Sequence, residues 1–223
     1  MTFLEEAIQA AMPLWRAAAD EDFLTEMGNG TLDRAAFLDY IVQDSLYLRD
    51  YLKAYAMALF KSRTLRQMQT FYSVLGYVND SENATRLAYL AEAGMTDDDV
   101  ETVEKKPACA AYTDFLLQVA QEEDVPEILM AVLPCMLGYR YVFEELVRRF
   151  PAVLEGAYAP LVRDYTAPGY AAACDEWTAF GNALCASLPA ERRAHLIDRF
   201  VQASAHELYF WQMAGGKPPR DPE

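Results

Sequence analysis

One cysteine lies where a helical pattern is interrupted. Cys135 directly follows Pro134 in the segment AVLPCMLGYRYV, and Tyr139 lies one turn later on the same face. A proline inside a helix removes a backbone hydrogen bond and bends the helix at a cost of about 3 kcal/mol, which is often tolerated where a distorted helix positions a functional side chain. The pattern permits two interpretations, a reactive nucleophile or one of the inert core cysteines common in apolar segments.

A carboxylate and two tyrosines share a helix face in the segment IVQDSLYLRDYLKAYA. Asp44, Tyr47 and Tyr51 are spaced i, i+3 and i+7, and apolar residues occupy overlapping faces. This spacing is compatible with an inward-facing aspartate that binds a ligand. It is also compatible with an exposed aspartate beside core tyrosines, because buried acids are rare.

A second acid has aromatic neighbours in FVQASAHELYFWQMA, near the C-terminus. Phe210 and Trp211 follow Glu207 at i+3 and i+4, so the carboxyl group could lie against aromatic walls, where desolvation would raise its pKa toward the range of a general acid. The alternative is an exposed helical glutamate beside a core aromatic pair. A thiol, two acids and several rings on three helices would suit a flat heteroaromatic ligand bound between those helices.

Capping residues and prolines predict the helices that carry these side chains. Thr2 and Glu5 form a capping box that starts the first helix, and Thr64 with Gln67 repeats the pattern. Prolines open later helices at their first turns. The predicted helices cover residues 3–19, 32–63, 65–79, 82–93, 107–122, 126–149 and 191–213, with shorter helices between 151 and 189.

Some boundaries depend on single side chains. Thr31 is expected to cap the long second helix after a break through Gly30, and Asp80 or Ser81 to cap the helix that begins near residue 82. The polar, acidic stretch 96–106 is expected to be a solvated connection.

No strand pattern competes with these helices, and no Pro/Gly/Ser linker divides the chain. We therefore predict an all-α protein, a single domain at residues 1–214 with roughly eight to ten helices, larger than a four-helix bundle. Residues 215–223 are expected to form a frayed C-terminal tail.

Charge and hydropathy exclude several classes of partner. The 223 residues include 34 acids against 19 Lys and Arg, a net charge of −15 that repels phosphate backbones, so we expect no nucleic-acid binding. Nowhere do about 18 apolar residues run together, so no membrane association is expected. The N-terminal segment has two acids where a signal peptide would be basic, and four cysteines occur without a CxxC pair, which together predict a reduced, cytoplasmic protein.

The sequence offers few of the side chains and motifs that bind metal or nucleotide cofactors. The only histidines are His195 and His206, eleven residues apart, so a site built on several imidazoles would be short of ligands. Neither GxGxxG nor GxxxxGK[ST] occurs among the ten glycines. Cys109, Cys174 and Cys185 are expected to be packing residues.

Four segments together resemble a known family. FLDYIVQDSLYL, PACAAYTDFLL, LPCMLGY and FVQASAHELYFW occur in the order and at about the intervals found in the TenA (thiaminase II) family, and the combination is far more specific than any one piece. The resemblance implies the haem-oxygenase-like all-α fold and an aminopyrimidine hydrolase of thiamin salvage. The implied substrate is a small molecule, 4-amino-5-aminomethyl-2-methylpyrimidine or thiamin, converted without a metal or organic cofactor, and the implied assembly is a homotetramer.

The resemblance also implies roles for individual residues. Cys135 matches the nucleophile, Glu207 the acid that protonates the substrate, and Tyr47 the hydroxyl that supports the thiol. Substrate-binding roles are implied for Asp44, which matches the carboxylate that binds the pyrimidine amino group, and for Tyr112, Tyr139 and Tyr165.

Two positions depart from the family pattern. Leu161 stands where a Trp usually precedes the tyrosine matched by Tyr165, so that alignment is less direct than the others. Glu82 is followed by Thr85 where the family commonly has a histidine, a change that concerns a surface or subunit contact.

Other activities occur on the same fold, which does not by itself determine function. A haem enzyme would need a histidine in the first helix, and residues 1–20 have none. An oxidase of the quinone-cofactor synthase type would need several histidines for its polyanionic substrate. A non-catalytic regulatory role is the remaining alternative; the acidic charge opposes direct DNA contact but leaves an indirect effect open.

Overall fold

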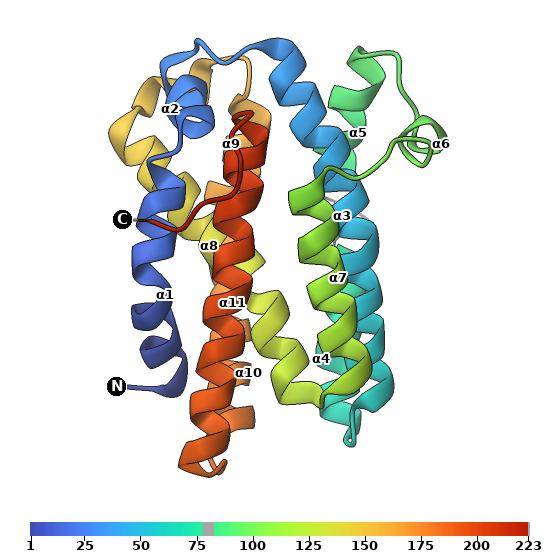
Figure 1. The fold of residues 1–223 in the computed structure, drawn as a ribbon, viewed down its shortest axis with the longest axis vertical. Coiled ribbons are helices and arrows are strands. Elements are labelled where there is room, and N and C mark those ends of the chain that lie inside the picture. Colours follow the sequence, from blue (N-terminus) through green and yellow to red (C-terminus); the bar gives the residue numbers. More distant parts are fainter. Residues whose placement is uncertain (78–82, 223) are drawn as a thin grey trace. The chain divides into compact units, whose positions relative to one another are not determined.

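The computed structural model describes residues 1–77 and 83–222, which are helical and contain no strand (Figure 1). The all-α prediction is therefore confirmed, with eleven α helices and one 3₁₀ helix in this part of the chain rather than eight to ten. The elements are α1 (Phe3–Ala19), α2 (Asp22–Asn29), α3 (Arg34–Lys61), α4 (Leu65–Tyr77), α5 (Asn83–Glu92), α6 (Asp97–Val100), α7 (Pro107–Glu122), α8 (Val125–Arg149), η2 (Pro151–Glu155), α9 (Ala159–Thr166), α10 (Pro168–Cys185) and α11 (Ala190–Ala214).

Predicted capping signals form the starts of α1, α4 and α7. The Thr2 hydroxyl accepts from the Glu5 amide and the Glu5 carboxylate from the Thr2 amide, so α1 begins with the expected capping box. Gln67 and Thr64 exchange the corresponding bonds at the start of α4. Pro107 occupies the first turn of α7, where its missing N–H would have had no helical partner.

Two short helices lie where the sequence predicted none. The first is α2, which ends at Gly30 in the left-handed conformation (φ 72°), after which Asp33 rather than Thr31 caps α3 by accepting from the amides of Ala35 and Ala36 at 2.8 and 3.1 Å. The second is α6, within the stretch expected to be a solvated connection; Thr96 caps it. The predicted cap at Asp80 or Ser81 lies outside the described residues.

The chain divides into two compact units. Unit 1 comprises residues 1–32 and 129–223, and unit 2 comprises residues 33–128. The prediction of one domain at 1–214 thus remains a prediction. Residues 215–222, expected to fray, return to α11 in unit 1, where Gln212 binds the Arg220 amide at 2.8 Å and Tyr209 donates to Asp221 at 2.5 Å.

Unit 1 is organised by α1, which packs along α11 and α10. Two long-range hydrogen bonds fix this packing: the Trp15 indole donates to Ser204 Oγ on α11 at 3.1 Å, and the Leu4 amide donates to Asn182 on α10 at 2.9 Å. The helix α8 has the length and apolar composition of a membrane-spanning helix, but 72% of its apolar window is buried inside the protein, as in a core helix.

Unit 2 is organised by α3, against which α7, α4 and α5 pack. Side chains of α3 hold α7 at both ends. The Gln43 amide donates to the Glu104 carbonyl at 3.1 Å and accepts from the Lys106 amide at 2.8 Å, just before α7 begins. At the other end, Lys61 donates to the carbonyls of Gln121 and Glu123 at 3.0 and 2.6 Å, which places a cation at the negative end of the helix dipole.

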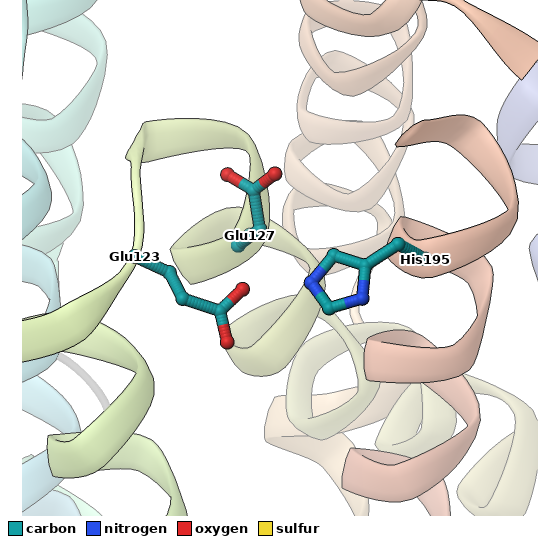
Figure 2. A group of neighbouring side chains, drawn as sticks. All are labelled: Glu123, Glu127 and His195. Atoms are coloured by element: carbon teal, nitrogen blue, oxygen red, sulfur yellow. The ribbon is translucent and has the colours of Figure 1, made fainter. Parts of the chain in front are cut away.

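The turn that follows belongs to the same unit. Glu123 directly follows α7, and Glu127 lies in the first turn of α8 (Figure 2). The Lys61 contacts fix the main chain at Gln121 and Glu123, where this turn begins.

Close packing in unit 1 makes Gly28 a sensitive position. A Cβ added there would lie 2.4 Å from the ring and 3.0 Å from the Cβ of Phe150. We expect Gly28→Ala to lower the free energy of unfolding by about 1–3 kcal/mol, because overpacking outweighs the helix propensity that alanine gains. Urea denaturation followed by circular dichroism measures this.

Gly169, on α10, is the matched control, since a Cβ there meets no atom within 4 Å. Gly169→Ala should leave stability unchanged or raise it by up to about 1 kcal/mol. Equal destabilisation by the two substitutions would contradict the packing argument.

Candidate active site

The seven predicted site residues divide between the units. Unit 1 contains Cys135 and Tyr139 on α8, Tyr165 on α9 and Glu207 on α11. Unit 2 contains Asp44 and Tyr47 on α3 and Tyr112 on α7. That the two groups serve one pocket remains a prediction.

Burial decides between the interpretations of the two acids. Asp44 is 7% exposed and Glu207 is 4% exposed, so neither lies on a solvated helix face. Few carboxylates are buried to this degree in folded proteins without a specific partner or function. Both acids therefore have the environment expected of binding or catalytic groups.

The cysteines also differ in their surroundings. Cys109, Cys174 and Cys185 are buried, as expected of packing residues, whereas Cys135 is half-buried. Burial raises the pKa of Cys109 and of Cys174 to about 12, so neither forms a thiolate near neutral pH. Cys135 is thus the accessible thiol of the four.

Three helices of unit 1 place rings around Tyr139. Its ring centroid lies 4.9 Å from that of Tyr165 on α9 and 5.0 Å from that of Trp211, one turn beyond Glu207 on α11. Phe143 stacks on Tyr165 at 4.8 Å with an interplanar angle of 12°. The structure thus brings together two predicted tyrosines, and it places them in one aromatic cluster with the helix that carries Glu207.

Unit 2 brings its own predicted residues together. The rings of Tyr47 and Tyr112 lie 4.8 Å apart, and Tyr47 also contacts Tyr51 at 5.5 Å. The Asp44 carboxylate is close enough to Cys109 on α7 to raise that thiol's pKa, although burial is the larger cause. Asp44, Tyr47 and Tyr112 therefore occupy one region between α3 and α7.

Two lysines pair with a buried aspartate in this region. Asp50, 2% exposed, accepts hydrogen bonds from Lys105 and, at 2.6 Å, from Lys53. Burial alone would raise the pKa of Asp50, but these hydrogen bonds outweigh it and hold the pKa below its ordinary value. Lys105 also donates to Thr113 Oγ1 at 2.7 Å. Through Lys105, the segment that precedes α7 is therefore bound both to Asp50 on α3 and to Thr113 on α7.

Sequence reasoning missed several residues of these clusters. Phe143 could have been found from its spacing, one turn beyond Tyr139. Tyr170 carries no such signal, since it lies on α10 and contacts Tyr165 across the break at Pro168, with ring centroids 5.2 Å apart.

The helices define a known fold class. A domain from Shewanella denitrificans, described as having a heme oxygenase-like fold, matches with a TM-score of 0.75 at 12% identity, over 96% of this chain and 92% of that one. At this identity the match establishes the fold alone. The predicted haem-oxygenase-like fold is confirmed.

The chain belongs to the TENA/THI-4/PQQC family, whose family model matches residues 8–217. A structure described as a TenA family transcription regulator, from Silicibacter sp. TM1040, has a TM-score of 0.85 at 28% identity over 95% of this chain and 96% of that one. An uncharacterised Haemophilus influenzae protein is 31% identical over 94% of this chain and 97% of its own. The aminopyrimidine aminohydrolase of Halalkalibacterium halodurans is 27% identical over 96% of both chains.

Proposed function

We propose that this protein is an aminopyrimidine aminohydrolase of thiamin salvage, which releases 4-amino-5-hydroxymethyl-2-methylpyrimidine from the 5-aminomethyl analogue, from thiamin, or from both. The supporting observation is the burial of Asp44 and Glu207, the two acids assigned to the substrate. Membership of the family and the named relative, aligned over 96% of both chains, support the same reaction.

In the proposed mechanism Cys135 is the nucleophile. Its thiolate adds to an electron-poor carbon of the pyrimidine ring while Glu207 donates a proton to a ring nitrogen. The amine or thiazole on the exocyclic methylene then leaves with the electron pair of its bond to the methylene carbon. Water adds to the methylene as a hydroxyl group and releases a proton to solvent. The ring nitrogen returns its proton to Glu207 as the carbon–sulfur bond breaks and the thiolate leaves. Tyr47 supports the thiol by hydrogen bonding.

The remaining residues bind and orient the ring. Asp44 accepts hydrogen bonds from the exocyclic amine, which fixes the carbon presented to the thiol. Tyr112, Tyr139 and Tyr165 supply aromatic surfaces suited to a flat heteroaromatic ring. All the chemical roles are thus filled by side chains, without a metal or organic cofactor.

Substitution of Asp44 tests the binding half of this proposal. Asp44→Ala removes a charge-assisted hydrogen bond worth roughly 1.5–3 kcal/mol, so affinity for the aminopyrimidine should fall about ten- to a hundred-fold. Turnover should fall as well, because a rotating ring seldom presents the reactive carbon. Isothermal titration calorimetry measures the affinity.

Asp39→Ala is the control on the same helix, since the Asp39 side chain is 39% exposed and pairs with Lys106 at 2.5 Å. It should bind the pyrimidine like the wild type. Normal binding by Asp44→Ala would instead leave Asp44 without a role in recognition.

The reaction itself is tested by incubating the purified protein separately with the aminomethylpyrimidine and with thiamin. Chromatography should detect the hydroxymethylpyrimidine from at least one of them, and the ratio of the two rates identifies the preferred substrate. Absence of product from both would refute the proposed function.

We also propose a cytoplasmic homotetramer. Phe60, Leu65 and Tyr72 of unit 2 are 70–82% exposed in the single chain, an amount of apolar surface that association would bury. The four cysteines are all thiols, as in a reducing compartment. Light scattering coupled to size-exclusion chromatography should give about four times the 25.2 kDa chain mass.

A further inference from the structure

A tyrosine outside the predicted site binds the backbone next to Cys135. The Tyr170 hydroxyl, on α10, donates to the carbonyl of Met136 at 3.0 Å. The Cys174 thiol, one turn later on α10, approaches the same oxygen at 3.8 Å. Because a carbonyl oxygen has two lone pairs, Met136 can accept the Tyr170 hydroxyl in addition to its helical partner.

This contact lies where α8 is weakened. Pro134 has no N–H, so the α8 backbone lacks one hydrogen bond in the turn that leads to Cys135. A hydrogen bond from outside the helix, two residues beyond the proline, restrains the backbone immediately after the thiol. Tyr170 is only 5% exposed, so water competes weakly for this bond.

The same side chain also supports the aromatic cluster. The Tyr170 ring contacts that of Tyr165 edge to face, at 5.2 Å and 89°, and Tyr165 in turn packs against Tyr139. One side chain therefore connects the backbone that carries the thiol to the tyrosines assigned to the substrate.

We propose that Tyr170 is a positioning residue, which sets the distance between the Cys135 sulfur and the substrate carbon through the Met136 carbonyl. The inference rests on the proposed function of Cys135. Tyr170 does not itself enter the chemistry. A displacement of about 1 Å in a reacting atom can cost on the order of a hundred-fold in rate, so loss of this restraint should affect turnover more than binding.

Tyr170→Phe tests the proposal, because it removes the hydroxyl and keeps the ring. We expect kcat to fall about ten- to a hundred-fold and KM to change by less than about three-fold. The second measurement is the rate of Cys135 alkylation by iodoacetamide between pH 6 and 9, followed by mass spectrometry of the Cys135 peptide. Its rate and pH profile should shift in Tyr170→Phe.

Tyr158→Phe is the matched control. Tyr158 is also 5% exposed in unit 1, and its hydroxyl likewise donates to a backbone carbonyl, that of Leu32, at 2.8 Å. Its loss should lower stability by about as much as Tyr170→Phe does, without changing kcat or the alkylation profile.

The outcomes separate the inference from the function on which it rests. Wild-type kcat and alkylation in Tyr170→Phe, or equal losses in both variants, would overturn the positioning role. If the wild type hydrolyses neither substrate while Tyr170→Phe alone shifts Cys135 alkylation, the proposed function fails and the positioning of the thiol stands.

Discussion

Replacing Cys135 with serine should lower hydrolysis of the aminopyrimidine by on the order of a thousand-fold or more and leave its binding close to the wild-type level. Serine keeps the shape and polarity of the side chain, but its hydroxyl ionises far less readily than a thiol, so covalent addition to the ring nearly stops. The binding residues on α3, α7 and α9 are unchanged. Single-turnover kinetics measures the chemical step, and calorimetry measures the retained affinity.

Cys185→Ala provides the comparison, since Cys185 is a buried thiol at the end of α10 in the same unit. It should lose stability rather than turnover. Hydrolysis by Cys135→Ser at the wild-type rate would show that Cys135 belongs to the inert core, and the mechanism would need another nucleophile.

Glu207→Gln should lower kcat by roughly a hundred- to ten-thousand-fold, the range of general acid catalysis, with a much smaller effect on KM. Glutamine is nearly isosteric and can still donate a hydrogen bond to a ring nitrogen, but it cannot transfer the proton. The pH profile of kcat should also lose the limb that the carboxyl group controls. Steady-state kinetics from pH 5 to 9 gives both results.

Glu191→Gln is the control for charge, because Glu191 lies exposed in the first turn of the same helix, α11. It should retain wild-type kcat at every pH. A Glu207→Gln variant with unchanged kcat would remove Glu207 from the proton transfer and leave its burial to be explained by binding.

The sequence predicts the long helices well because their ends are local. The capping bonds between Thr2 and Glu5 join residues within one turn of the chain. Pro107 favours a helix start through its own backbone alone. The short helices escape prediction because their stability is tertiary. In α2, for example, Phe23 and Met27 are buried, the Phe23 ring contacts that of Trp211 on α11, and eight residues provide little intrinsic helix stability.

For the candidate site, too, the sequence predicts what depends on spacing within one helix and misses what depends on contacts between helices. The spacing places Asp44 and Tyr47 on one face of α3, but it does not determine whether that face points into the protein or toward solvent. The burial of Asp44 depends on tertiary packing, and on α3 such packing includes the bonds by which Gln43 and Lys61 hold α7, to residues about sixty positions away. The contact between Tyr170 and Met136, 34 residues apart, is likewise invisible to a pattern read along one helix.

The two hydrogen bonds of the Gln43 side chain limit which sequence changes this protein can tolerate. The Gln43 side chain binds two main-chain groups, the carbonyl of Glu104 and the amide of Lys106, so these hydrogen bonds do not depend on the side chains at those positions. Amino-acid replacements at those two positions preserve them, provided the amide at 106 remains. An insertion or deletion between α6 and α7, in contrast, would move the bonded peptide groups out of register. These two hydrogen bonds therefore constrain the length of the connection rather than the side chains at positions 104 and 106.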